Sequence, residues 1–192
     1  MGSRQEVLLT GSGGQGLILA AIILAEAAVN DNKNVVQTQS YGPEARGGAS
    51  MAGVIIDVDT IEYPKVTNPN VLLCMSEAAY KKYLTRVTPG ALVIVDSTFI
   101  SGPFPKEYSI YAYPITRMAR EKLGRDVVAN MVALGAVNAA SCLVSRDVLK
   151  ESILHRAPKG SGEINQQAYE LGYRLYEQGM EPDRGFTAQT PQ

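Results

Sequence analysis

The sequence has few of the residues that build metal centres. Its 192 residues include two cysteines, Cys74 and Cys142, and a single histidine, His155. An iron–sulfur cluster usually takes four thiolates and a structural zinc site takes four Cys or His ligands, so the chain cannot build either one alone. Both cysteines lie in apolar runs. We therefore expect two buried, unpaired thiols in a reducing compartment, and no bound metal.

Net charge is also nearly absent, because 18 basic residues stand against 19 acidic ones. This excludes the basic surface of a protein that wraps nucleic acid or adheres to anionic lipid. The apolar run at residues 17–29 contains Glu26 and follows glycines rather than a basic segment, which is not typical of a signal peptide. The longest apolar stretch, residues 127–144, includes Asn130 and Asn138 and predicts a core helix. We expect a soluble, cytoplasmic protein without nucleic-acid or membrane partners.

Motifs for acid–base or nucleophilic catalysis are missing as well. There is no GxSxG elbow, and Ser12 and Ser40 have no histidine partner in the sequence. Asp96 follows a predicted strand, where it either belongs to a site or caps the turn after it, and capping is the favoured interpretation. His155 is expected on the surface. We predict no catalytic residue in this chain.

What the sequence does contain is an alternation of strand and helix patterns over the first 125 residues, with helical patterns closing the chain. Strands are predicted at residues 6–10, 34–39, 50–58 (with a hairpin arm at 60–63), 71–75, 91–95 and 108–113. Helices are predicted at residues 17–29, 77–86, 115–123, 127–144, 146–155 and 166–178. This order predicts an α/β fold of three layers: an open, mostly parallel sheet with helices on both faces and a helical C-terminal part. Residues 1–180 are expected to form a single domain, and residues 181–192 a mobile or partner-contacting tail.

A glycine-rich turn, GSGGQG at residues 11–16, lies between the first strand and the first helix and matches G-x-G-x-x-G. Glycines permit a tight turn and close approach of a ligand, and the helix N-terminus attracts an anion. The candidate binding residues are Gly13, Gly14, Gln15 and Gly16. A dinucleotide site would need a carboxylate at the end of the second strand, but Asp31 precedes that strand, which weighs against NAD or FAD. Contact with another phosphate or a neighbouring subunit, and helix–strand packing alone, both stay open.

A polar loop, reading QTQSYGPEARGG at residues 37–48, follows the second strand at the edge where open α/β sheets carry their sites. Arg46 either pairs with Glu44 in a solvated turn or grips a carboxylate or phosphate through its planar fork. The candidate residues of this loop are Tyr41, Glu44, Arg46, Gly47 and Gly48.

The strand–GSGGQG–helix opening, the TQSYGPEARGG loop and the ANMVALGA segment at residues 129–136 resemble the gamma subunit of 2-oxoacid:ferredoxin (or acceptor) oxidoreductases. The similarity extends over essentially the whole chain, and the SYGPEARGG form looks most like the 2-oxoglutarate branch. The resemblance implies a subunit of an enzyme that decarboxylates a 2-oxoacid, joins the acyl group to coenzyme A and reduces ferredoxin or a similar acceptor. It also implies that thiamine diphosphate and iron–sulfur clusters belong to the partner alpha, beta and delta subunits.

The same resemblance implies a role for the two glycine-rich segments. The candidates in the turn and in the polar loop would form two walls on the side of the site where coenzyme A enters, while the chain alone would bind no cofactor. The isolated chain is expected to be inactive and able to form a homo-oligomer. The same role in a pyruvate or other 2-oxoacid oxidoreductase, a stand-alone dinucleotide-binding module, and a spacer without ligand contact are the alternatives.

Two helical features could belong to a subunit interface. Asn130 and Met131 stand near the start of an apolar helix, where a buried amide needs a partner from the sheet or from another subunit. Tyr169, Tyr173 and Tyr176 recur at three- and four-residue spacing on the last helix. For these tyrosines core packing is the favoured interpretation, and an interface stripe is the alternative.

Overall fold

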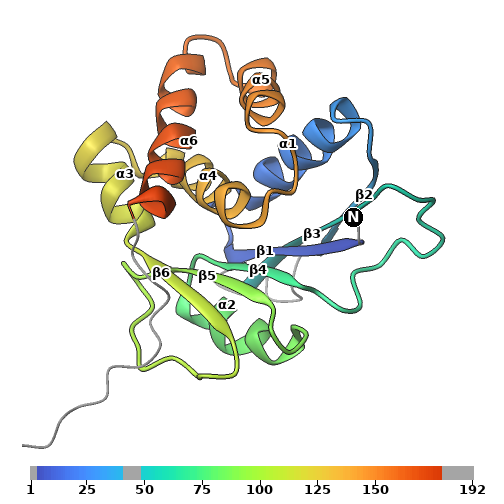
Figure 1. Ribbon diagram of the computed structural model, residues 1–192. Helices are drawn as coiled ribbons and strands as arrows, with labels where there is room; N and C mark the ends of the chain where they lie inside the picture. The colour runs from blue at the N-terminus through green and yellow to red at the C-terminus, as the bar shows by residue number, and fades with distance from the viewer. Residues whose placement is uncertain (1–3, 41–48, 179–192) are drawn as a thin grey trace, which may run out of the picture.

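The computed structural model describes residues 4–40 and 49–178, which form one mixed sheet and the helices that cover it (Figure 1). The strands are β1 (Gln5–Ser12), β2 (Asn34–Ser40), β3 (Ala49–Asp57), β4 (Val71–Cys74), β5 (Leu92–Asp96) and β6 (Ser109–Tyr113). The helices are α1 (Leu17–Asn30), α2 (Glu77–Tyr83), α3 (Ile115–Leu123), α4 (Ala129–Ser141), α5 (Arg146–Arg156) and α6 (Gly162–Glu177). Two short 3₁₀ turns, η1 (Leu84–Arg86) and η2 (Asp126–Val128), follow α2 and precede α4.

The six strands lie in the order β2-β3-β1-β4-β5-β6. Strands β1, β4, β5 and β6 are parallel, whereas β3 is antiparallel to both of its neighbours, β1 and β2. Only eight residues separate β2 from β3, and a connection that short joins antiparallel neighbours, since a parallel crossover needs a dozen residues or more. The predicted α/β fold is confirmed, with parallel pairings in the majority.

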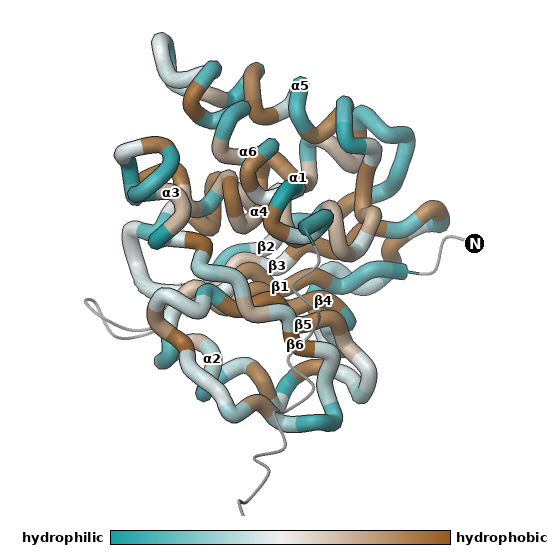
Figure 2. The backbone as a smooth tube through the Cα atoms, turned by 60° about the vertical axis from the view of Figure 1, so that its left-hand side comes forward, coloured by the Kyte–Doolittle hydropathy of each residue, from teal (hydrophilic) through white to brown (hydrophobic). Residues whose placement is uncertain are grey.

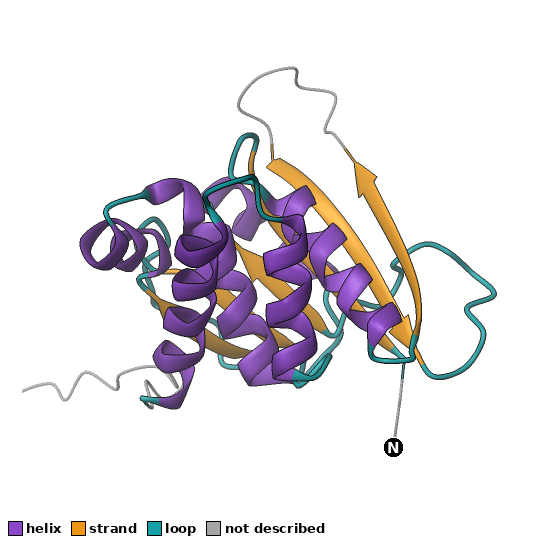
Figure 3. Ribbon diagram, turned by 90° about the horizontal axis from the view of Figure 1, so that it is seen from above, coloured by secondary structure: helices purple, strands orange, loops and turns teal. Residues whose placement is uncertain are grey.

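Helices cover both faces of the sheet, as predicted. Figure 1 shows α2 on one face and α1, α4, α5 and α6 on the other, and Figure 3 looks down onto this larger helical layer. Successive strand residues point to opposite faces, so Val7 and Leu9 enter the core beneath the large layer while Leu8 enters the smaller core with α2. Figure 2 accordingly shows hydrophobic residues along the central strands β1, β4 and β5.

The two largest helices of the C-terminal part approach each other through glycines. A Cβ atom at Gly172 of α6 would lie 2.0 Å from the carbonyl oxygen of Val132 and 2.7 Å from the amide nitrogen of Ala136, both in α4. A Cβ atom at Gly135 of α4 would lie 2.2 Å from the carbonyl oxygen of Tyr169. The two backbones are in direct contact, so both positions require glycine.

Among the residues described here, no helix is both long and apolar enough to cross a membrane.

The predicted hairpin arm at residues 60–63 was wrong, because this segment belongs to an irregular loop between β3 and β4. Side chains satisfy the loop's backbone in place of a neighbouring strand. The buried Glu6 carboxylate accepts hydrogen bonds from the amides of Thr67 and Asn68 at 2.6 and 2.8 Å, and the Arg4 guanidinium donates to the carbonyl of Tyr63. Helix α6 also starts at Gly162, four residues before the predicted start.

The two cysteines differ in environment, contrary to the expectation that both are buried. Cys74, at the end of β4, is fully buried, and burial raises the pKa of its thiol to about 12 despite a hydrogen bond from the Thr10 hydroxyl. Cys142 is exposed in the left-handed residue that ends α4, with a φ of 51°. The turn is set by Asn138, whose amide group both donates to and accepts from the backbone of Val144. The chain therefore leaves the helix one turn before the predicted end.

Candidate functional site

The glycine turn is fastened to the end of the neighbouring strand by Gln15. Its Oε1 accepts a hydrogen bond from the amide of Ser12 at 2.7 Å, and its Nε2 donates to the carbonyl of Met75 at 3.0 Å. Gly14, with a φ of 89°, and Gly16, with a φ of 72°, lie on either side of Gln15 in the chain and both adopt the left-handed conformation. The polar atoms of Gln15 are therefore used to shape the turn.

Gly16 is required by packing within the chain. A Cβ atom there would lie 2.4 Å from Nδ2 of Asn130, and that same nitrogen donates a hydrogen bond of 3.1 Å to the Gly16 carbonyl. The Asn130 oxygen accepts from the amide of Met131 at 3.0 Å. Asn130 and Met131 are both buried. The amide thus finds its partner on the glycine turn of its own chain.

Gly13 and Gly14 present a different environment. Both are exposed, and a Cβ atom at either position would meet nothing within 4 Å. Gly14 needs its left-handed backbone, but nothing within the described chain requires Gly13 to lack a side chain. The space in front of these two residues is open to a ligand or to another subunit.

The polar loop connects the end of β2 to the start of β3, which pairs with the end of β1. Tyr41, Glu44, Arg46, Gly47 and Gly48 lie outside the described residues. In the register of the sheet, Ser12 at the end of β1 pairs with Ala49 at the start of β3, and Ser40 at the end of β2 pairs with Met51. The connection from β2 to β3 therefore starts and finishes at the edge of the sheet that carries the glycine turn.

This edge is also where helices leave for opposite faces. Helix α1, which follows β1, belongs to the large helical layer on one face of the sheet. Helix α2, which follows β4, packs on the opposite face of the sheet. In open α/β sheets ligands bind at such a switch point, outside the carboxyl ends of the strands.

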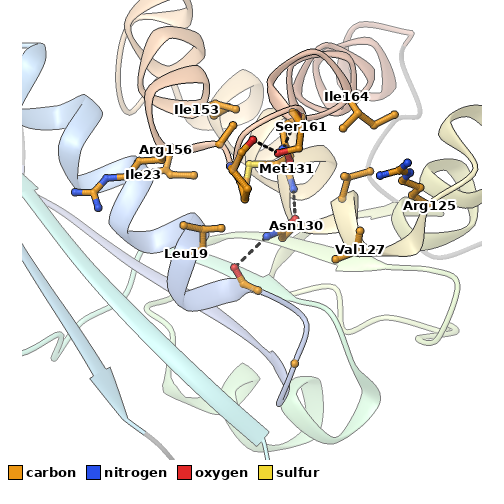
Figure 4. A pocket seen from close by; sticks show the side chains of 16 residues that line it. Leu19, Ile23, Arg125, Val127, Asn130, Met131, Ile153, Arg156, Ser161 and Ile164 are labelled. Atoms are coloured by element: carbon orange, nitrogen blue, oxygen red, sulfur yellow. Dashed lines mark hydrogen bonds between the residues drawn. The ribbon is translucent and has the colours of Figure 1, made fainter.

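Two cavities flank the turn, and Gly14 lines both. One, of about 300 Å³, lies over the ends of β4 and β5 between Gln15, Met75, Phe99 and Thr116. The other, of about 260 Å³, lies between α1, α4, α5 and the start of α6 (Figure 4). Val127 lies in the wall of both. The exposed apolar side chains of Phe99 and Val127 were not recognised from the sequence. Phe99 lies in a predicted connection and Val127 begins the predicted helix at residues 127–144, so the apolar character of each was its only signal.

Asp96 has the structural role that capping implies. It is fully buried, and its Oδ1 accepts from the amide of Thr98 while its Oδ2 accepts from the amide and hydroxyl of Thr116, at 3.1 and 2.5 Å. These bonds join the end of β5 to the start of α3. Both carboxylate oxygens are engaged within the chain, and Asp31, the other carboxylate considered, is held by Lys33 and Ser145.

The tyrosine stripe packs mainly in the core, as favoured from the sequence. Tyr169 and Tyr173 are buried. The Tyr169 hydroxyl donates to the carbonyl of Arg146, and the Tyr173 hydroxyl accepts from Asn138. Tyr176 is half-buried against the ring of Tyr111.

Over residues 4–40 and 49–178, no three Asp, Glu, His or Cys side chains gather in a way that could hold a metal ion.

A surface ion cluster ties α1 to α5 beside the second cavity. Glu26 accepts hydrogen bonds from Arg156 Nε at 2.5 Å and contacts His155 Nδ1 at 2.8 Å, and the His155 side chain is 77% exposed, confirming its surface position. The bond from Arg156 is the largest influence on Glu26. It outweighs partial burial and holds the pKa of this carboxyl below its ordinary value.

The lowered pKa predicts a stability effect in acid. Because the folded pKa of Glu26 lies below its unfolded value of about 4.3, its contribution is present above that value and is lost as pH falls through the folded pKa. Glu26→Gln should lower the unfolding free energy at pH 7 by about 0.5–1 kcal/mol, since both partners of Glu26, Arg156 and His155, are exposed. Urea unfolding at pH 7 and pH 3 checks this. A difference from wild type that persists undiminished at pH 3 would contradict it.

The pyruvate ferredoxin/flavodoxin oxidoreductase family model matches residues 6–175, which is most of the chain and includes the glycine turn, the residues lining both cavities and most of α6. The chain belongs to this family. The 2-oxoglutarate synthase subunit KorC of Methanocaldococcus jannaschii is 45% identical over 175 residues, covering 90% of this chain and 94% of that subunit. Within the family, then, the likeness is to the 2-oxoglutarate branch, as the loop sequence indicated.

Solved structures of family members have the same fold. The gamma subunit of a keto/oxoacid ferredoxin oxidoreductase from Geobacter sulfurreducens superposes with a TM-score of 0.81 at 39% identity, covering 91% of this chain and 99% of that one. The 2-oxoglutarate:ferredoxin oxidoreductase of Magnetococcus marinus, solved with 2-oxoglutarate, coenzyme A and succinyl-CoA bound, gives a TM-score of 0.82 at 21% identity. That match covers 93% of this chain but 32% of the longer one, and at this identity it establishes the fold alone. The predicted resemblance to gamma subunits is confirmed.

Proposed function

We propose that this chain is the gamma subunit of a 2-oxoglutarate:ferredoxin oxidoreductase, which decarboxylates 2-oxoglutarate, transfers the succinyl group to coenzyme A and passes two electrons to ferredoxin or a similar acceptor. The likeness to KorC over nearly the full length of both chains supports this assignment. Alpha, beta and delta subunits would complete the enzyme. The iron–sulfur clusters would reside on those partners, because two cysteines and one histidine cannot hold a cluster. The family resemblance implies the same for thiamine diphosphate.

The chain's own contribution would be to the coenzyme A side of the site. The observation that carries this proposal is the open, exposed backbone of Gly13 and Gly14 at the switch point of the sheet. Coenzyme A bears a pyrophosphate and a 3′-phosphate, and the free amides at the N-terminus of α1 favour a negative group there. Arg46, from the connection between β2 and β3, would supply a bidentate partner for a phosphate.

Graded substitution at Gly13 tests this role in the assembled enzyme. A Cβ atom at Gly13 meets nothing within 4 Å among the described residues, so Gly13→Ala and Gly13→Val should leave the melting temperature of the isolated chain within about 2 °C. If a ligand approaches this backbone closely, Gly13→Val should raise the KM for coenzyme A at least about tenfold and Gly13→Ala should raise it less. The KM for 2-oxoglutarate should change little, because the loss is of coenzyme A binding.

Arg46→Ala should give a rise of similar size, and Arg46→Lys should recover part of it because the charge remains while the fork is lost. Lys65→Ala is the matched control, since Lys65 is an exposed cation in the loop between β3 and β4, at the opposite edge of the sheet. Unchanged coenzyme A kinetics in the Gly13 and Arg46 variants would exclude the coenzyme A contact and leave the subunit assignment intact. Turnover of pyruvate but not 2-oxoglutarate by the wild-type complex would overturn the choice of branch.

A further inference from the structure

The cavity of about 260 Å³ beside the glycine turn is lined mainly by apolar side chains. Ile23 of α1, Met131 of α4 and Ile153 of α5 form its inner wall, and Ile164 of α6 lies on the side near Arg125 (Figure 4). The Asn130 amide is already engaged with Gly16 and Met131, so the interior offers little polar binding capacity. Such a cavity would accept an apolar group.

Part of the rim of this cavity is formed by exposed apolar side chains. Val127 is 74% exposed and Leu19 is 38% exposed, and Figure 4 shows both at the side of the cavity nearest the glycine turn. Isolated exposed apolar side chains are common, but two that border one apolar cavity form a surface that would be covered favourably by a partner. Gly14 also lines the cavity, so this surface is continuous with the turn.

One cation at the rim has no counter-charge. Arg125 is exposed and has no hydrogen-bond or ion-pair partner among residues 4–40 and 49–178. Its neighbour Asp126 is neutralised by a bidentate pair with Arg120, at 2.9 and 2.6 Å. Arg156, on the opposite side of the cavity (Figure 4), is neutralised by Glu26 of α1. The rim therefore presents a net positive charge that complements a carboxylate.

We propose that this cavity is a docking socket for a bulky apolar side chain on a partner subunit, with a carboxylate near that side chain in the partner's sequence. The inference rests on the proposed function, which makes the chain part of a heteromeric enzyme. A cavity of roughly 150 Å³ already holds a benzene ring, so about 260 Å³ suits one aromatic or long aliphatic side chain. It falls below the roughly 300–1,000 Å³ of small-molecule sites. A single buried anchor with a polar rim is the usual form of a strong interface contact.

The test measures binding of the purified full-length chain to the complex of the remaining subunits, by biolayer interferometry at moderate salt. Val127→Asp should weaken the Kd at least about 30-fold, because it places a charge at the apolar rim. Arg125→Glu should weaken it about tenfold and mainly through the association rate, while Arg125→Lys should stay near wild type. Val58→Asp is the control: Val58 is 54% exposed just after the end of β3, and the Kd of this variant for the remaining subunits should change less than twofold.

Both rim residues are exposed, so the variants should fold, and melting temperatures within about 2 °C of wild type would verify this. Wild-type affinity in Val127→Asp and Arg125→Glu would overturn the docking socket while leaving the proposed function standing. Loss of self-association in the isolated Val127→Asp chain, with heteromeric affinity unchanged, would assign the cavity to a second copy and also overturn it. Failure of the wild-type chain to bind the remaining subunits would instead contradict the proposed function.

Discussion

Replacing Gly172 with alanine is expected to lower the free energy of unfolding by about 3 kcal/mol or more, the upper range for overpacking a core. The added Cβ atom would lie 2.0 Å from the carbonyl oxygen of Val132 and 2.7 Å from the amide nitrogen of Ala136. Both contacts are with the backbone of α4, which cannot rotate away as a side chain can. The two helices would have to separate, and the apolar surface between them would lose its packing.

The same substitution at Gly162, in the first turn of the same helix, provides a matched control. A Cβ atom there would lie 3.5 Å from Leu154 Cδ2, which is an ordinary van der Waals distance. Gly162→Ala should therefore raise the unfolding free energy by up to about 0.5–1 kcal/mol, since alanine restricts the unfolded chain. Urea denaturation followed by circular dichroism measures both. Equal effects of the two variants would show that the close approach of α4 and α6 does not limit stability.

Removing the Asp96 carboxylate is expected to cost about 2–4 kcal/mol of unfolding free energy. Asp96→Ala would leave the Thr116 amide and hydroxyl and the Thr98 amide without their acceptors, and the Asp96–Thr116 bonds are buried. An unsatisfied buried donor costs about 1–3 kcal/mol. The loss should also loosen the connection between β5 and α3, since the carboxylate joins these two elements.

A double-mutant cycle with Thr116→Val isolates the contact. Thr116→Val removes the hydroxyl but keeps the side-chain shape and the backbone amide, so it should cost less than Asp96→Ala. The coupling between the two changes should be about 1–2 kcal/mol, as expected for residues in one hydrogen-bond network. Asp59→Ala, at an exposed carboxylate in the loop after β3, should change stability by less than about 0.5 kcal/mol. Zero coupling would mean that Thr116 finds another partner.

Most elements could be predicted from local sequence pattern, because each needs only its own apolar periodicity. The prediction was correct within two residues at each end for helices α1 and α3 and for strands β1 and β4. Pairing partners could not be obtained this way. Whether β3 lies between β1 and β2 depends on contacts that are distant in sequence. The start of α6 was missed because Gly162 and Asn165 weaken the helical pattern locally, while packing of α6 against α4 decides the outcome.

The candidate site could be predicted only in part. The motif located the turn, and the observed conformations of Gly14 and Gly16 fit the reason glycine was expected there. The motif could not distinguish glycines that packing requires from glycines with free space around an added Cβ atom. Gly16 is held against Asn130, which is 114 residues away, whereas an added Cβ atom at Gly13 would meet nothing within 4 Å in the part of the chain that the structure describes. Asn130 and Val127 are brought to the turn by the tertiary fold, so the local sequence could not predict that they lie beside it.

The unequal cysteines make the unmodified sequence suitable for selective labelling. Burial and a raised pKa keep the Cys74 thiol protonated at neutral pH, and the thiolate is the reactive form. Cys142 is exposed, and these two are the only cysteines in the chain. A maleimide dye would therefore attach at the end of α4 without any substitution. A fluorophore at that single position would report distances to labelled partner subunits as the complex assembles.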